Sequence, residues 1–356
     1  MFKKVISITM ALVLSLTGFA VTGCKKQSTN PLVGIFMPTK EQPIWAAYGA
    51  RLEEGFKAAG YDVVLEFAED VAERQVGQIE NAITKGAKYV VIAAVDSFAL
   101  TDVCQKAKDA KIKVISCDRL LMNTPNVDYY VTFDMIRLGE IQGEAIVDAL
   151  NLKTAAGPFN MEIFSGSPDD NNIIPFYEGF MKVIKPYLDS KKLVVKSGQV
   201  SLAVTGILKW DSATAQSRMD NILGAYYTKD KLDVVHAMAD CLSLGVISSL
   251  TSFGYGAGTL KFPVVTGQDS ELTAVKSIIE GKQTMTMFLD PKILTEKMLS
   301  VVKSIEDGTK ITPDTTYNNG KFDVPTILYD PVKIDKTNYT VLVDRGFYTK
   351  EALGIK

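Results

Sequence analysis

The amino-acid sequence predicts an α/β protein with two successive open lobes, and three observations carry this prediction. From residue 32 onward, short apolar runs alternate with longer amphipathic stretches. The same rhythm restarts after residue 134 in a second array of similar size. The composition, 47% hydrophobic and 22% charged in 356 residues, is that of an ordinary folded chain long enough for two domains. Strands that alternate with helices form βαβ units, hence parallel sheets with helices on both faces.

Each half supplies its own strands and helices. In the first half, strands are expected to begin near Leu32, Asp62, Tyr89, Lys113 and Tyr129, with helices at 45–59, 71–85 and 97–111. In the second half, strands are expected near Met161, Leu193, Asp233, Phe262 and Thr284, with helices at 135–150, 173–187, 211–226, 241–252, 271–281 and 294–307. Gly60 and Gly86 stand where two of the first helices should end, as glycine often does.

The first residues are expected to be an export signal. A basic start precedes a mostly apolar stretch, residues 5–21, and small residues then lead to Cys24. The run 21–24 (VTGC) resembles a bacterial lipobox, which implies removal of residues 1–23 and acylation of Cys24, with palmitate among the acyl chains. Several acyl chains would hold the protein stably at a membrane, and residues 24–31 would be a tether. An unacylated secretory signal and an uncleaved membrane anchor remain as alternatives.

Several classes of function are disfavoured. The 39 basic and 41 acidic residues leave no charge excess suited to nucleic acid. The single histidine, His236, lies in an apolar strand pattern and is expected to be a core residue. Cys104, Cys117 and Cys241 are an odd number, so buried free thiols are expected in place of a disulfide framework. No metal or cofactor motif is recognisable, and no catalytic set; a glycosidase-like pair of acids stays open.

Acidic side chains recur where predicted strands end. These residues are Asp96, Asp118, Asp134, Asp240 and Asp269, and the loop 165–172 (SGSPDDNN) adds acids and amides after another strand. Ligands of open parallel sheets bind outside the carboxyl ends of the strands, so these groups would line one cleft if the lobes face each other. The alternative for any single acid is a helix N-cap.

Each half also has one tryptophan on this expected edge, Trp45 and Trp210, and Trp210 is expected to begin a helix. A pyranose has apolar C–H faces, which aromatic rings cover, and a hydroxyl rim, which donates hydrogen bonds to carboxylates and amides. Two tryptophans among acids therefore favour a sugar site, whereas each tryptophan alone would also suit a protein core.

The chain resembles periplasmic sugar-binding proteins of ABC importers, of the ribose/galactose type, and is most similar to the xylose-binding and multiple-sugar-binding proteins. The resemblance spans roughly residues 32–345. It is carried by MPTKEQPIW (37–45), QIENAITKGAKYVVIAAVD (78–96), KVISCDR (113–119), YYVTFD (129–134), SGSPDDNN (165–172), KPYLDSKKLVVKSGQ (185–199), KWDSATAQSRMDNIL (209–223) and VVTGQDSE (264–271).

The resemblance implies a type I periplasmic-binding fold: two Rossmann-like lobes with parallel sheets, joined by a three-strand hinge. The N-terminal lobe would comprise 32–133 plus 290–328, and the C-terminal lobe 134–289 plus 329–356. The three crossings would lie near Asp134, Asp290 and Tyr329. Sugar binding would close the lobes.

The resemblance also implies roles for individual residues. Trp45 and Trp210 match the family's stacking aromatics, and the hydroxyl-binding positions are matched by Asp118, Arg119, Asp170, Asn172 and Asp269. By the same resemblance, Asp96 and Asp134 are expected to have structural or hinge roles and not to bind ligand. The role of Asp169 stays open. The chain departs from the family at Ile44, Ala239 and Leu289, where xylose or multi-sugar binders have polar residues. The ligand is therefore expected to be xylose, glucose, galactose or a related sugar, with a deoxy sugar, an amino sugar or a less polar ligand also open.

The expected function is capture of a monosaccharide for delivery to the subunits of an ABC permease. The alternative is a sensory role, in which the same fold presents the sugar to a histidine kinase or chemoreceptor. An enzyme is a third, weaker alternative. A transcription repressor of this fold would need an N-terminal helix-turn-helix, and the signal and tether occupy that place.

Overall fold

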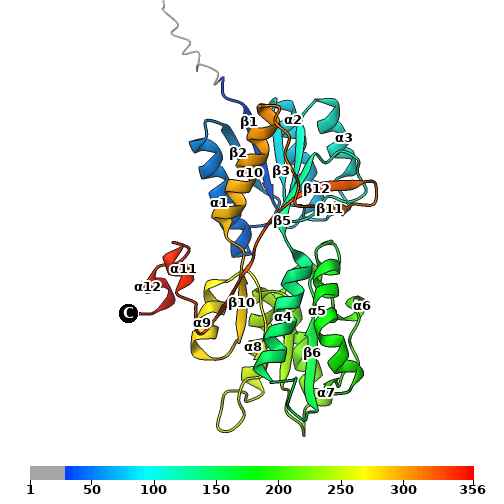
Figure 1. Ribbon diagram of the computed structural model, residues 1–356, viewed down its shortest axis with the longest axis vertical. Helices are drawn as coiled ribbons and strands as arrows, with labels where there is room; N and C mark the ends of the chain where they lie inside the picture. Colours follow the sequence, from blue (N-terminus) through cyan, green and yellow to red (C-terminus); the bar gives the residue numbers. More distant parts are fainter. Residues whose placement is uncertain (1–28) are drawn as a thin grey trace, which may run out of the picture.

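The computed structural model describes residues 29–356 and consists of two α/β lobes stacked end to end (Figure 1). The predicted signal, the predicted lipidation site Cys24 and most of the predicted tether lie outside the described residues. The upper lobe in Figure 1 holds a seven-stranded sheet of order β11-β12-β5-β4-β3-β1-β2. Its strands are β1 (Leu32–Met37), β2 (Asp62–Phe67), β3 (Tyr89–Ile92), β4 (Lys113–Cys117), β5 (Tyr129–Phe133), β11 (Thr315–Asn318) and β12 (Asp323–Tyr329). All neighbouring pairs are parallel except β11 and β12.

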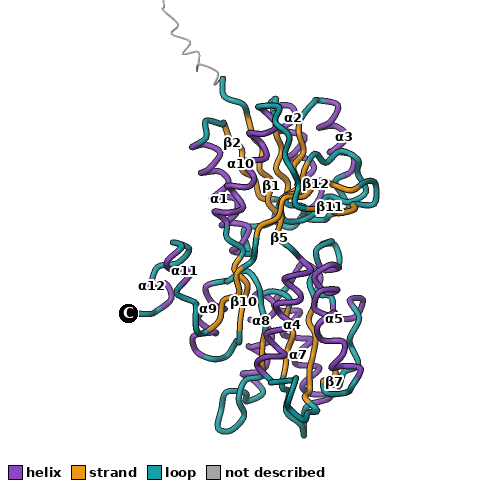
Figure 2. Tube along the Cα trace, in the orientation of Figure 1, coloured by secondary structure: helices purple, strands orange, loops and turns teal. Residues whose placement is uncertain are grey.

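The lower lobe holds a four-stranded parallel sheet of order β7-β6-β8-β9 and an antiparallel pair, β10 and β13. Its strands are β6 (Phe159–Phe164), β7 (Leu193–Val195), β8 (Val234–Ala237), β9 (Val264–Val265), β10 (Met285–Phe288) and β13 (Val332–Asp335). Mostly parallel sheets covered by helices confirm the predicted α/β class with two lobes. In Figure 2 the strands of each lobe form a central layer with helices on both sides.

Helices surround each sheet close to the predicted positions. The upper lobe has α1 (Pro43–Ala58), α2 (Ala72–Thr84), α3 (Thr101–Asp109) and α10 (Pro291–Glu306). The lower lobe has α4 (Met135–Ala149), α5 (Ile173–Asp189), α6 (Leu202–Thr205), η1 (Leu208–Trp210), α7 (Ser212–Tyr226), α8 (Asp240–Ser252), α9 (Leu272–Glu280), α11 (Val341–Asp344) and α12 (Lys350–Leu353). None of the helices within residues 29–356 is long and apolar enough to cross a membrane.

Strand β3 ends earlier than its apolar run, which continues to Val95. The buried side-chain amide of Gln75 donates to the carbonyl of Ala93 at 2.8 Å and accepts from the N–H of Val95 at 2.9 Å. The Gln75 side chain thus forms the hydrogen bonds that the backbone groups of Ala93 and Val95 would otherwise form with a neighbouring strand. The residues after Ile92 are thereby free to approach the other lobe.

Three segments pass between the lobes. They join β5 to α4 at Asp134, β10 to α10 at 289–290, and β12 to β13 at 330–331. The Asp134 carboxylate caps α4 by accepting from the N–H of Arg137 at 3.0 Å. Asp290 caps α10 and forms a 3.0 Å ion pair with Arg345. Both acids therefore have structural roles beside the crossings.

His236 is a buried core residue, as expected from its apolar strand, but its ring nitrogens have no hydrogen-bond partner within the described chain. The ring stacks on Phe180 at 3.6 Å between centroids. Burial lowers the pKa of His236 to about 3. The ring is therefore neutral and serves as an aromatic packing group. Cys104 and Cys117 are buried free thiols as predicted, whereas Cys241 is only partly buried.

Candidate ligand-binding site

A cavity lies between the two lobes, at the carboxyl ends of their strands. About 480 Å³ of space in and at the mouth of this cavity is not filled by protein atoms. Its lining residues are Gln42, Ile44, Trp45, Asp118, Arg119, Met135, Asp170, Asn172, Phe176, Trp210, Ala239, Cys241, Gln268 and Asp269. All seven residues predicted to bind ligand are brought together here, whereas Asp96, Asp134 and Asp240 are not part of the lining.

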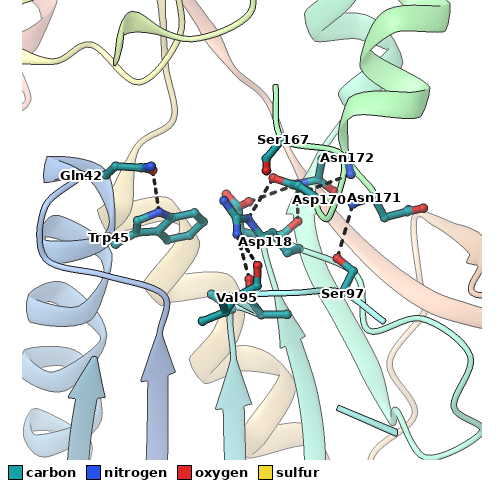
Figure 3. Close-up of polar contacts among 12 residues, drawn as sticks. Gln42, Trp45, Val95, Ser97, Asp118, Ser167, Asp170, Asn171 and Asn172 are labelled. Atoms are coloured by element: carbon teal, nitrogen blue, oxygen red, sulfur yellow. Dashed lines mark hydrogen bonds and ion pairs between the residues drawn. The ribbon is translucent and has the colours of Figure 1, made fainter. Parts of the chain in front are cut away.

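The upper lobe contributes Trp45 from the first turn of α1. Pro43 starts this helix at a position where its missing N–H costs nothing. The Trp45 indole N–H donates to Gln42 Oε1 at 3.0 Å, which fixes the ring orientation (Figure 3). The Arg119 guanidinium carbon lies 4.9 Å from the centre of the Trp45 ring, a cation–π distance. The aromatic ring and the guanidinium are thus held as one unit.

Contacts from the lower lobe complete a closed arrangement. Arg119 Nε lies 2.9 Å from Asp170 Oδ2, and both side chains are about 95% buried. Asn172 Nδ2 donates to the Asp118 backbone carbonyl at 3.0 Å and to its carboxylate at 3.2 Å (Figure 3). Asp118 and Arg119 follow β4, whereas Asp170 and Asn172 follow β6. These contacts therefore join the lobes through the cavity wall itself.

Further contacts between the lobes surround the cavity. Gln42 Nε2 donates to the carbonyl of Lys209 at 3.3 Å, and Lys209 Nζ donates to the carbonyl of Asp70 at 3.2 Å. In addition, the N–H of Ser97 donates to the carbonyl of Asp169 at 3.1 Å. Asp169 therefore contributes its backbone to the closed form, and its side chain is not part of the cavity lining.

Three of the lining residues have left-handed backbone. The φ angles are +62° at Asp118, +55° at Trp210 and +96° at Asp269. A side chain in this region costs about 1–3 kcal/mol of strain, and such residues cluster at binding sites. The turn directs each side chain out of its strand or helix and into the cavity, a feature that the sequence pattern does not reveal.

Trp210 differs from its predicted setting. The sequence indicated that it begins a helix, but it ends the short turn η1, and α7 begins two residues later. Its ring lies directly against Gly166, where an added Cβ would be 2.0 Å from the indole carbon Cη2. Gly166 is thus required for close approach of the ring, and any side chain there would displace the indole.

Three carboxylates meet in this small volume. Burial raises the pKa of Asp118, assisted by the negative charge of Asp170. Burial likewise raises the pKa of Asp170, against the attraction of Arg119. Burial raises the pKa of Asp269 to about 6. These carboxylates are acceptors in a buried volume, and the hydroxyl groups of a ligand would supply further donors to them.

Ligand affinity is expected to depend on the ionisation of Asp269. Above pH 6 the carboxylate is ionised and accepts charge-assisted hydrogen bonds from the ligand. Below pH 6 it is protonated, and the hydrogen bonds that it accepts are weaker. If binding requires the ionised form, the Kd of a neutral sugar should rise by up to about tenfold per pH unit below 6. Calorimetry from pH 8 to pH 5 would measure this, and an equally steep profile in Asp269→Asn would contradict the assignment.

Sequence reasoning missed part of the lining. Gln42, Met135, Phe176, Cys241 and Gln268 were not predicted as site residues. Their signal is positional only, since each lies within a few residues of a strand end or in the first turn of a helix. Two of the family departures, Ile44 and Ala239, do line the cavity, whereas the third, Leu289, is buried outside it.

The arrangement suits binding of a small polar molecule. Aromatic and aliphatic surfaces alternate with acids and amides, and the walls come from both lobes. Within residues 29–356, no group of His, Cys, Asp and Glu side chains is placed to hold a metal ion. Two lobes that close over a buried polar cavity define a bilobal solute-binding protein.

Comparisons with known proteins place the chain more narrowly. Residues 33–310 match the family of periplasmic binding protein domains. The chain is 48% identical over 354 residues to the multiple sugar-binding periplasmic receptor ChvE of Rhizobium radiobacter, covering 99% of both chains. It is 34% identical over 299 residues to the D-xylose-binding periplasmic protein of Escherichia coli (strain K12), covering 83% of this chain and 84% of that one. The chain belongs to the periplasmic binding protein family.

Solved structures agree with this assignment. An ABC transporter solute-binding protein from Clostridium phytofermentans with bound β-D-glucose matches with a TM-score of 0.87 and 44% identity, covering 90% of this chain and 99% of that one. A carbohydrate transporter solute-binding protein from Chloroflexus aurantiacus in complex with D-glucose matches with a TM-score of 0.81 and 32% identity, covering 90% and 97%.

Proposed function

We propose that this protein captures a monosaccharide in the cavity between its lobes and delivers it to an ABC permease. The observation that carries the proposal is the set of two tryptophans, three carboxylates and one guanidinium around a single enclosed space. The names of similar proteins support the proposal: two relatives are named as sugar-binding periplasmic proteins, and a similar solved structure is an ABC solute-binding protein with bound glucose.

Each group of side chains has a distinct task in this mechanism. Trp45 and Trp210, one from each lobe, would cover the apolar faces of a sugar ring. The carboxylates of Asp118, Asp170 and Asp269 would accept hydrogen bonds from its hydroxyl rim. Such bonds to charged groups contribute roughly 1.5–3 kcal/mol each. Neither lobe alone presents this set, so the sugar would hold the two lobes closed.

The closed form would be the form that the permease recognises, as an extracytoplasmic carrier requires. The lipobox-like run ending at Cys24 supports attachment to the outer face of the cytoplasmic membrane through acyl chains. The roles of Trp45, Asp118, Arg119, Asp170, Asn172, Trp210 and Asp269 as ligand-binding residues, and the assignment of 32–133 plus 290–328 and 134–289 plus 329–356 to the two lobes, belong to this proposal.

A second candidate is presentation of the sugar to a membrane-bound sensor. It is favoured by one observation, that the 48% identical relative is named a receptor. Both functions use the same cavity. Co-purification separates them, since a carrier should be retained by its permease and a sensory subunit by a kinase or chemoreceptor. A catalytic role is not proposed, because the relatives are named as binding proteins and receptors.

Calorimetry on the mature chain tests sugar binding directly. With glucose, xylose, galactose and arabinose at pH 7, we expect one-to-one binding of at least one sugar with micromolar or lower Kd. The Asp170→Asn variant should bind that sugar more weakly, because it loses both a charged acceptor and the partner of Arg119. Absence of binding to every pentose and hexose tested would contradict the proposal.

A further inference from the structure

The charges that line the cavity do not balance. Asp118, Asp170 and Asp269 are acidic, and of the lining residues in the described chain only Arg119 is basic. With all four groups ionised, the site therefore has two more negative than positive charges. Lys209, the nearest lysine at the cavity edge, directs its ammonium to the carbonyl of Asp70 and does not line the cavity.

The one guanidinium is already committed. Arg119 Nε pairs with Asp170 Oδ2 at 2.9 Å, and its Nη1 donates to the carbonyls of Ala94 and Val95 at 2.9 and 3.2 Å. Neither Asp118 nor Asp269 forms an ion pair within the described residues. Asp118 at least accepts from Asn172 across the cleft. Among the described residues, the Asp269 carboxylate thus has neither an ion pair nor a hydrogen bond from across the cleft.

The surroundings of Asp269 are poor in donors and rich in acceptors. Its side chain receives one long hydrogen bond, 3.3 Å, from Gln268 Nε2. The other end of that amide, Gln268 Oε1, is buried and has no partner in the described chain. Burial, together with the negative charge of Asp269, raises the pKa of the neighbouring Glu271 to about 7. Gln268 and Asp269 both line the cavity, so this wall contributes a carboxylate and an amide whose oxygen has no partner within the described chain.

We propose that this wall binds an ammonium group, so that the preferred ligand is a monosaccharide with a primary amine in place of one hydroxyl. An ammonium carries three N–H donors and a positive charge, which fits both the Asp269 carboxylate and Gln268 Oε1. It also removes half of the charge excess of the site. A deoxy sugar would instead leave these acceptors unpaired, which is costly for buried groups. The inference rests on the proposed sugar-binding function.

Calorimetry at pH 7 with D-glucose, D-glucosamine, 3-amino-3-deoxy-D-glucose, 6-amino-6-deoxy-D-glucose and N-acetyl-D-glucosamine tests the inference. We expect at least one of the three amino sugars to bind about tenfold more tightly than glucose, because a charge-assisted bond replaces a neutral one. N-acetyl-D-glucosamine, which has a neutral amide, should show no such gain. If glucose binds and no amino sugar binds more tightly, the inference is wrong and the proposed function stands. If no sugar in this series or among the neutral sugars binds, both fail.

A pair of variants assigns the preference to Asp269. In Asp269→Asn the ratio of the amino-sugar to glucose affinities should fall to about one, because the charge is gone and the amide keeps a similar shape. Asp211→Asn is the matched control: it removes a charge outside the cavity, and asparagine keeps the α7 N-cap that Asp211 provides. The control should retain the full preference. An equal loss in both variants would show a long-range effect of net charge and would overturn the assignment.

Discussion

Replacing Trp210 with alanine is expected to weaken sugar binding by about 2–4 kcal/mol, a roughly 30- to 1,000-fold increase in Kd. The indole is the largest of the apolar side chains that the lower lobe brings to the cavity, the others being Met135, Phe176 and Ala239. Its loss removes ring-face contact that exists only when the lobes are closed. Calorimetry on the purified variant measures the change.

The variant should still fold. Trp210 lies in the turn η1 before α7, outside the strands of both sheets, and its buried ring contacts Gly166 at the cavity. Tyr226→Ala is a matched control, because Tyr226 is a half-exposed aromatic residue at the end of α7 that does not line the cavity. The control should bind sugar normally. Full affinity in Trp210→Ala would show that the stacking assignment is misplaced.

Replacing Arg119 with methionine is expected to have the second large effect. The substitution keeps an apolar stem of similar length but leaves Asp170 buried without its 2.9 Å partner. Removing one member of a buried ion pair costs about 3–5 kcal/mol, because the remaining charge has no compensation. We expect binding at pH 7 to fall at least 100-fold, since the closed form then requires repulsive acids to face each other.

Two further variants separate the ion pair from a general loss of charge. Arg137→Met removes an exposed cation that pairs with Glu140 and Glu144. This variant should lose less than about 1 kcal/mol of folding stability, because exposed ion pairs contribute little. In the Arg119→Met background, Asp170→Asn should recover part of the thermal stability by removing the orphaned charge. If Arg119→Met binds sugar as tightly as the unaltered protein, the guanidinium does not organise the site.

The fold was predictable from the sequence because hydrophobic periodicity reports burial directly. The run at 113–117 is strand β4, and the amphipathic stretch at 173–187 is α5 with two further residues. Where the predicted strands differ from the observed ones, the causes are local. Gln75 ends β3 early through its side-chain amide, and β11 is a half-exposed edge strand with no apolar run to mark it. Neither effect is visible in a pattern of hydrophobic residues.

The candidate site was predictable only as a set of residue types at strand ends. Contacts between the lobes, such as Arg119 with Asp170, join residues that are distant in sequence and depend on closure. The left-handed backbone at Trp210 could not be predicted, because no glycine occupies that position. Apolar lining residues such as Met135 and Phe176 resemble ordinary core positions. Identifying them required the cavity itself.

A crystal structure of the mature chain with the best-binding sugar tests the central claim most directly. We predict one sugar ring in the cavity between the lobes, in contact with the indoles of both Trp45 and Trp210, with hydroxyl or amino groups within hydrogen-bond distance of Asp118, Asp170 and Asp269. A sugar bound elsewhere, or a ring in the cavity that touches neither indole, would contradict the account.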